Sequence, residues 1–181
     1  MTTYIGITRI LALAGVTDFS WVDEEARWRG SEVHRAVALA DRQSLDWRSV
    51  PKRLDGFVEA HFKFMKETGF IPTHIEHAIK SKELGIRGRI DRIGLLHGKR
   101  VVLDLKTGTL DAAVGLQLAL YGHLFDPKAW WKRIGVRLSN DGTYTLKIWG
   151  LTEWHADLNI ALCAVKLAKW KIAHGCVRSK T

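Results

Sequence analysis

Cysteine is scarce in this sequence of 181 residues, which contains only Cys163 and Cys176. Two thiols are too few for the disulfide framework of a small secreted domain. They are also too few for a four-thiolate zinc site or a cysteine-ligated iron–sulfur cluster. We therefore expect a protein of the reducing cytoplasm that carries no iron–sulfur cluster.

Proline and long apolar runs are scarce as well. Three prolines, 46% hydrophobic residues and 26% charged residues are typical of a folded protein and exclude a disordered or collagen-like chain. No stretch approaches the roughly 20 apolar residues that cross a bilayer. The short apolar stretch Ile10–Val16 lacks the basic leader of a secretion signal, so we interpret it as a core segment. We expect a soluble chain without signal peptide or transmembrane segment, folded as one domain over residues 1–181.

Acidic residues are fewer than basic ones, with 19 Asp and Glu against 28 Lys and Arg, which gives a net charge of +9. This excess favours a polyanionic partner, either nucleic acid or an anionic membrane surface. The basic residues do not line one face of a markedly amphipathic exposed helix, which is the pattern of a membrane-surface protein. We therefore expect nucleic acid rather than a membrane.

Hydrophobic periodicity predicts an α/β protein. Apolar residues at three- and four-residue spacing predict helices from Asp23 to about Leu39 and over Pro51–Glu67. Between His74 and Lys106, glycines separate short β-type runs, which predicts three strands. Further expected elements are a helix from Asp111 to Phe125, strands Val136–Leu138 and Tyr144–Trp149, and a last helix opening at Thr152. One central mixed β-sheet flanked by α-helices accommodates this order.

Two aspartates in the predicted strands carry the strongest chemical signal. If His97 and Gly98 form a two-residue hairpin turn, Asp91 and Asp104 lie opposite each other on neighbouring strands. Because side chains alternate along a strand, Lys106 shares their face.

Two carboxylates about 4 Å apart repel by roughly 4 kcal/mol at an effective dielectric near 20. Lys106 offsets part of this repulsion. Hard divalent cations such as Mg²⁺ bind carboxylate oxygens and bring phosphate oxygens along as further ligands. The pair therefore predicts a metal site rather than a surface hairpin with solvated acids.

These residues resemble a known family. The runs Gly88-Arg-Ile-Asp-Arg-Ile and Val101-Val-Leu-Asp-Leu-Lys-Thr-Gly are similar to the core of the PD-(D/E)xK nucleases, specifically the RecB-type exonuclease branch. Upstream, Gly30-Ser-Glu-Val-His34 matches the branch's Gly-x-x-x-His helix motif, and downstream Gln117-Leu-Ala-Leu-Tyr121 matches its Gln-x-x-x-Tyr motif. The motif-bearing core runs from about residue 30 to 125. Two departures are Ile90 in place of the family's Pro and Asp104 in place of the commoner Glu.

The resemblance implies a restriction-endonuclease-like fold and a set of site residues. It implies that His34, Asp91, Asp104 and the backbone carbonyl of Leu105 hold the metal. It gives Lys106 the role of orienting the attacking water. The resemblance also places an additional acid near the metals, for which Glu76 is the candidate; the alternative for Glu76 is a solvent-facing strand residue.

The resemblance and the charge pattern together suggest the residues that contact nucleic acid. Gln117 and Tyr121 stand four residues apart, so they project from one helical face, which in the family closes over the site and touches the strand. Arg89 and Arg92 crowd the acidic hairpin and could form a basic rim that binds phosphates without reading sequence.

We therefore expect a Mg²⁺-dependent deoxyribonuclease, with Mn²⁺ able to substitute. An exonuclease is favoured that acts on DNA with a free end or on single strands, in DNA recombination, repair or replication and with partner proteins of those processes. One alternative is a structure-specific endonuclease on the same fold. Another is a catalytically silent DNA-binding subunit, which should lack one ligand or the lysine.

Overall fold

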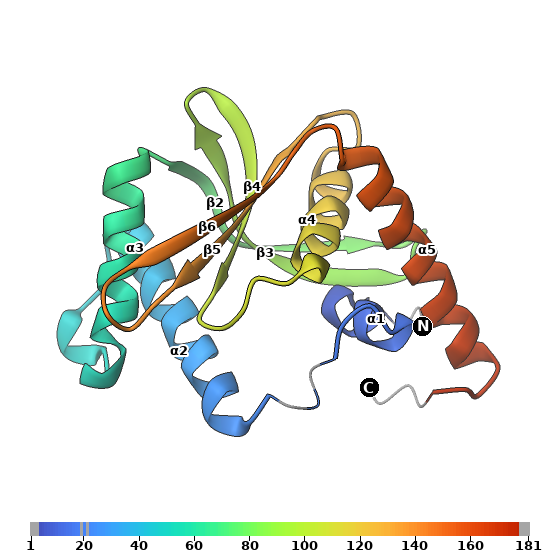
Figure 1. The fold of residues 1–181 in the computed structure, drawn as a ribbon, viewed down its shortest axis with the longest axis horizontal. Helices are drawn as coiled ribbons and strands as arrows, with labels where there is room; N and C mark the ends of the chain where they lie inside the picture. The colour runs from blue at the N-terminus through green and yellow to red at the C-terminus, as the bar shows by residue number, and fades with distance from the viewer. Residues whose placement is uncertain (1–3, 19, 21, 178–181) are drawn as a thin grey trace.

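The computed structural model describes residues 4–18, 20 and 22–177, which form five α-helices and six strands (Figure 1). The helices are α1 (Ile7–Ala14), α2 (Glu24–Asp41), α3 (Asp55–Thr68), α4 (Ala112–Phe125) and α5 (Trp154–Ala173). The strands are β1 (Ile5–Gly6), β2 (Ile71–Ser81), β3 (Ile86–Leu96), β4 (Lys99–Lys106), β5 (Lys132–Leu138) and β6 (Tyr144–Trp149). Two short 3-10 turns, η1 (Trp47–Ser49) and η2 (Lys52–Leu54), precede α3.

The strands form one mixed sheet in the order β1-β3-β4-β5-β6, with β2 also paired to β3. The pairs β1–β3 and β4–β5 are parallel, and the other pairs are antiparallel. Helices α2 and α3 lie to one side of the sheet, and α1, α4 and α5 lie to the other (Figure 1). The predicted α/β class with a central mixed sheet is confirmed.

Each layer of helices has its own hydrophobic core against the sheet. Val33 and Val37 of α2 and Phe57 of α3 pack in one cluster with residues of β4 and β5. The second cluster joins α1, α4 and α5 to β3, β4 and β6. It includes Ile10, the first residue of the apolar stretch Ile10–Val16. The interpretation of that stretch as a core segment is confirmed, since Ile10 and Leu11 are buried in α1. Within the described ranges, no helix combines the length and apolarity that crossing a membrane requires.

Local signals account for most element ends. The Asp23 side chain accepts a hydrogen bond from the Ala26 amide and caps α2, and Asp111 does the same for α4 through Val114. Gly69 ends α3 with a φ of 65°, a left-handed conformation that favours glycine.

Some predicted boundaries are wrong, and the last helix begins at Trp154 rather than at Thr152. The first turn of the helix expected from Pro51 is the separate 3-10 turn η2, so α3 begins at Asp55. Strand β5 begins at Lys132 and not at Val136, because Arg133 is fully buried with its charge paired to Asp157 and so breaks the expected apolar pattern.

The β3–β4 hairpin has the predicted two-residue turn. His97 and Gly98 both have positive φ values, 50° and 73°, as a type I′ turn requires. The expected register is observed where Gly94 pairs with Val101. The last backbone pair is Arg92 with Leu103, so Asp91 and Asp104 lie one step beyond the paired ladder.

Candidate active site

His34 reaches the sheet from α2. Its neighbours Val33 and Val37 are buried in the core, which fixes the rotation of the helix. The Nε2 atom of His34 lies 2.9 Å from the carbonyl oxygen of Leu105, a residue 71 positions further along the chain. Because a carbonyl oxygen only accepts, the imidazole donates this hydrogen bond, and the ring is held at the end of β4.

The other ring nitrogen of His34 faces two carboxylates. Nδ1 lies 3.6 Å from Oδ1 of Asp91 and 3.8 Å from Oε1 of Glu76. Ligand atoms of these three residues all lie within 4.8 Å of one another. The helix and the two strands thus converge on one small polar cluster.

Glu76 occupies an unusual backbone position in β2. The pairs on either side of it, Ile75 with Arg92 and His77 with Ile90, place it opposite Asp91. Its φ of 54° is left-handed, which for a non-glycine residue costs on the order of 1–3 kcal/mol. The Glu76 side chain is only 17% exposed. It is therefore directed into the cluster, and the alternative of a solvent-facing strand residue is wrong.

Asp91 and Asp104 are buried and have different partners. Oδ2 of Asp91 accepts a hydrogen bond of 2.7 Å from the Leu105 amide. The two oxygens of Asp104 lie 3.0 and 2.8 Å from Nζ of Lys106. Asp91, Asp104 and Lys106 line one cavity together, which is the shared face that strand alternation predicts.

The donor set suits a hard divalent cation. Around an octahedral ion at about 2.1 Å, neighbouring ligand atoms stand about 3 Å apart and opposite ones about 4 Å apart. The Nε2 atom of His34 and the Leu105 carbonyl oxygen, 2.9 Å apart, match neighbouring ligands of one ion, whereas the 3.6 and 3.8 Å separations at Nδ1 lie between the two values. Oδ2 of Asp104 is buried and, among the described residues, has no hydrogen bond of good geometry despite the nearby ammonium. Asp91, Glu76 and Asp104 supply the carboxylate oxygens that Mg²⁺ and Mn²⁺ prefer.

Burial and mutual charge shift the pKa values of these groups. Burial alone would lower the pKa of His34, but the carboxylates of Asp91 and Glu76 outweigh it and raise the pKa to about 9. Burial raises the pKa of Asp91 to about 6, against the opposing effect of His34. Burial alone would lower the pKa of Lys106, yet Asp104 and Asp91 raise it, so the ammonium stays charged. The site therefore holds a proton on His34 that a cation must displace.

Arg92 does not lie on the surface, so its predicted place on the basic rim is wrong. Its side chain is 1% exposed, and its guanidinium donates to Asp41, to Glu76 and to the carbonyl oxygen of Asp91. Asp41 in turn lies 2.7 Å from Nε2 of the buried His61. Its ion pairs with Asp41 and Glu76 offset the cost of burying this guanidinium.

Arg89, Gln117 and Tyr121, the predicted nucleic-acid contacts, line one cavity together with Asp91 and Asp104. Arg89 is exposed, and Gln117 donates a 3.2 Å hydrogen bond to the Tyr121 hydroxyl. Tyr121 itself is 4% exposed, and burial raises the pKa of its phenol to about 12. A Cβ atom at Gly88 would stand 2.5 Å from the Tyr121 ring, so only glycine leaves room for the tyrosine there.

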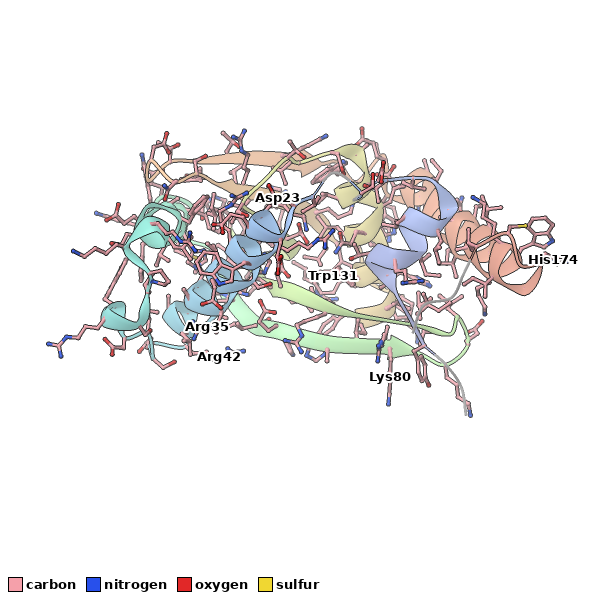
Figure 2. All side chains as sticks on the ribbon, turned by 90° about the horizontal axis from the view of Figure 1, so that it is seen from below. Asp23, Arg35, Arg42, Lys80, Trp131 and His174 are labelled. Atoms are coloured by element: carbon pink, nitrogen blue, oxygen red, sulfur yellow. The ribbon has the colours of Figure 1, made fainter. Side chains whose placement is uncertain are left out.

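Two cavities, of about 1060 and 800 Å³, adjoin the cluster. Thr8, Arg89, Lys106 and Gln117 line both, so the cavities meet at the site. Arginines of α2 add positive charge to the larger cavity. Figure 2 shows Arg35 on α2, Arg42 directly after its end, and Lys80, which lines the smaller cavity, on β2. The cavities offer a cationic path on either side of the acidic cluster.

Asp41 and His61 were not predicted from the sequence. Asp41 stands seven residues after His34 and so on the same face of α2 two turns later, which is a signal that helical periodicity supplies. His61 lies in a different helix, and no spacing rule connects it to the site.

The comparison with protein families settles the family. The model of the PD-(D/E)XK nuclease superfamily matches residues 17–145, well over half of the chain. The chain belongs to the PD-(D/E)XK nuclease superfamily. The resemblance seen in the sequence is confirmed, and the protein is a nuclease of a superfamily whose members use divalent metals.

A solved structure shares the fold of this PD-(D/E)XK nuclease, and two others are similar to it at lower TM-scores. A candidate exonuclease from Eubacterium rectale aligns with a TM-score of 0.61 at 13% identity, over 98% of this chain and 84% of that chain. An alkaline exonuclease from Laribacter hongkongensis aligns with a TM-score of 0.41 at 10% identity, over 96% and 93% of the two chains. The same exonuclease in complex with dAMP gives a TM-score of 0.39 at 11% identity, over 96% and 93%. No curated protein matches the chain.

Proposed function

We propose that this nuclease is a divalent-metal-dependent DNA exonuclease, with the metal held by His34, Asp91, Asp104 and the Leu105 carbonyl and with Glu76 beside it. The observation that carries the proposal is the convergence of His34, Glu76 and Asp91 next to the Asp104–Lys106 ion pair, at the junction of two cavities. Mg²⁺ is the proposed ion and Mn²⁺ its substitute, because the donors are oxygens and one imidazole nitrogen.

The chain's own groups have separate roles in the proposed reaction. When bound, the cation lowers the pKa of a water ligand and neutralises phosphate oxygens. The Leu105 amide holds Asp91 in place for that cation. The Lys106 ammonium, directed by Asp104, orients the attacking water and stabilises the negative charge that develops on the phosphate.

Exonuclease action fits the cavities better than site-specific cutting. Arg89 and the α2 arginines bind backbone phosphates, which guides a strand without reading its sequence. Gln117 borders both cavities and Tyr121 the smaller one, where they would contact a strand that passes the metal. Digestion from a free end or of single strands is the resulting proposal, and such digestion would serve DNA recombination, repair or replication. Since every ligand and the lysine are present, a catalytically silent subunit is not favoured.

The deciding experiment compares linear and covalently closed DNA, single- and double-stranded, with Mg²⁺, Mn²⁺ or EDTA. We expect linear DNA to be degraded to short products with either metal, and closed circles to survive. If closed single-stranded circles were cut as fast as linear strands, the exonuclease proposal would be refuted and an endonuclease would be favoured. Tyr121→Ala should slow digestion while the protein remains folded by circular dichroism.

A second experiment tests the metal ligands. Asp104→Asn removes a carboxylate ligand and a charge that repels phosphate, so cleavage should be abolished while DNA binding is unchanged or tighter. Cleavage rates and DNA affinity are measured on the same preparation. Turnover near that of the unchanged protein in Mg²⁺ would refute the assignment of Asp104.

A further inference from the structure

A buried arginine links the cluster to the interior of the protein. Arg92 is a β3 residue next to Asp91, and its Nη1 atom lies 3.1 Å from Oε1 of Glu76 and 2.6 Å from the carbonyl oxygen of Asp91. Its Nε atom lies 2.5 Å from Oδ2 of Asp41. One planar guanidinium thus joins α2, β2 and β3 behind the site.

The arginine is itself fixed from behind. Asp41 is 4% exposed and accepts from Arg92 through one oxygen, while its other oxygen lies 2.7 Å from Nε2 of His61 in α3. His61 is 1% exposed. Such an arrangement leaves the guanidinium little freedom to move, and its fork geometry serves two acids at once in a way that a lysine ammonium cannot.

The acid that Arg92 holds is the one whose backbone is strained. Glu76 has its φ of 54° in the middle of β2, between regular pairs with β3. The same Oε1 atom that accepts from Arg92 faces Nδ1 of His34. The ion pair therefore defines where the Glu76 carboxylate stands relative to His34 and Asp91.

We propose that Arg92 is a positioning residue that acts through Glu76, holding this carboxylate ready beside His34 and Asp91 so that the cation site is formed before the cation arrives. Asp41 binds Arg92 and His61 binds Asp41, so both residues support the same positioning of Glu76. The inference rests on the proposed function, because it gives Glu76 a place at the metal. Outer residues that orient ligands in this way typically change metal affinity by about 10- to 100-fold when they are replaced.

The experiment measures Mn²⁺ affinity of the whole chain by calorimetry, together with the Mg²⁺ concentration that gives half-maximal cleavage. Arg92→Lys keeps the positive charge but cannot serve both acids, so the Kd for Mn²⁺ and the half-saturating Mg²⁺ concentration should rise at least about 10-fold. Cleavage at saturating Mg²⁺ should recover to within a few-fold of the unchanged protein. Arg133→Lys is the matched control, since Arg133 is equally buried and paired to Asp157 outside the site.

The double variant tests the route. If Arg92 acts through Glu76, then adding Arg92→Lys to Glu76→Gln should produce no further loss of Mn²⁺ affinity beyond about two-fold. Losses that multiply would show that Arg92 acts by another route and would overturn the inference. An unchanged Kd in Arg92→Lys, with a lower melting temperature like that of Arg133→Lys, would make Arg92 merely structural and overturn it as well.

If Arg92→Lys does not fold, Asp41→Asn loosens the same guanidinium without removing it, and its Kd for Mn²⁺ should rise several-fold; an unchanged Kd would then refute the inference. An unaltered protein that neither binds Mn²⁺ nor cuts DNA would refute the proposed function itself and the inference with it. One that binds and cuts, with a normal Kd in Arg92→Lys, refutes the inference alone.

Discussion

The proton on His34 should compete with the metal, so metal affinity should depend steeply on pH. The pKa of His34 is raised to about 9, above its unfolded value near 6.5. This charge therefore contributes stability to the metal-free fold that is fully present below about pH 6.5 and is lost as the pH rises through about 9. Metal affinity should rise as His34 loses its proton, because the imidazole must be neutral to bind a cation.

The magnitude follows from the pKa. Between pH 8 and pH 6, the fraction of His34 that is neutral falls about 90-fold for a pKa of about 9, which is about 2.7 kcal/mol of metal-binding free energy. Below pH 6 a second proton enters, since the pKa of Asp91 is raised to about 6. For a domain of this size, about 2.7 kcal/mol corresponds to a melting shift of roughly 5–10 °C.

The assay is calorimetric titration with Mn²⁺ from pH 6 to pH 9, in buffers of different ionisation enthalpy, so that released protons are counted. Mn²⁺ affinity should rise about tenfold per pH unit from 6 to 8, with close to one proton released for each ion. His34→Gln is the control and should flatten this slope. Affinity that is independent of pH in the unchanged protein, with no proton release, would refute the role of His34.

Further perturbations test other parts of the site. Lys106→Ala should lower turnover by orders of magnitude with a small change in DNA affinity, because the ammonium acts in the transition state; parallel losses of both in kinetic and binding assays would make it one more phosphate contact. Mg²⁺ or Mn²⁺ should raise the melting temperature, and Asp104→Asn should reduce that increment, as differential scanning fluorimetry would show. Gly88→Ala places a methyl group 2.5 Å from the Tyr121 ring and should destabilise the fold by about 1–3 kcal/mol in urea unfolding. A neutral effect would show that the tyrosine moves easily.

Much of the fold could be predicted because the helix caps and turn residues in the sequence lie where the helices and the hairpin begin or turn. Helices α2 and α4 begin after the capping aspartates that the sequence displays, and the β3–β4 hairpin turns at the expected pair His97 and Gly98. Strand β5 was predicted too short because its first residues are basic. The partner that makes burial of Arg133 possible, Asp157, lies 24 residues away in α5, beyond the reach of any local pattern.

The site was predictable to the extent that its residues share strands or helix faces. Strand alternation places Asp104 and Lys106 together, and the ion pair between them is observed. Alternation could not show that Arg92 turns inward, because that depends on Asp41 from α2, 51 positions away. Glu76 stands opposite Asp91 with a left-handed backbone, and no spacing rule shows this backbone or the contacts of Glu76 with Arg92 and His34.

The attachment of α2 has a consequence for the growing chain. Val33 and Val37 belong to the same hydrophobic cluster as Ile134 and Val136 of β5, so the core that contains the helix with His34 is complete only after β5 has been made. The β3–β4 hairpin, with both aspartates, is synthesised earlier and pairs over a two-residue turn. A nascent or truncated chain that ends before β5 would therefore carry the acidic hairpin, but the hydrophobic core around the helix with His34 would be incomplete. Competence to cut DNA is thus expected to arise late in synthesis, together with the central sheet.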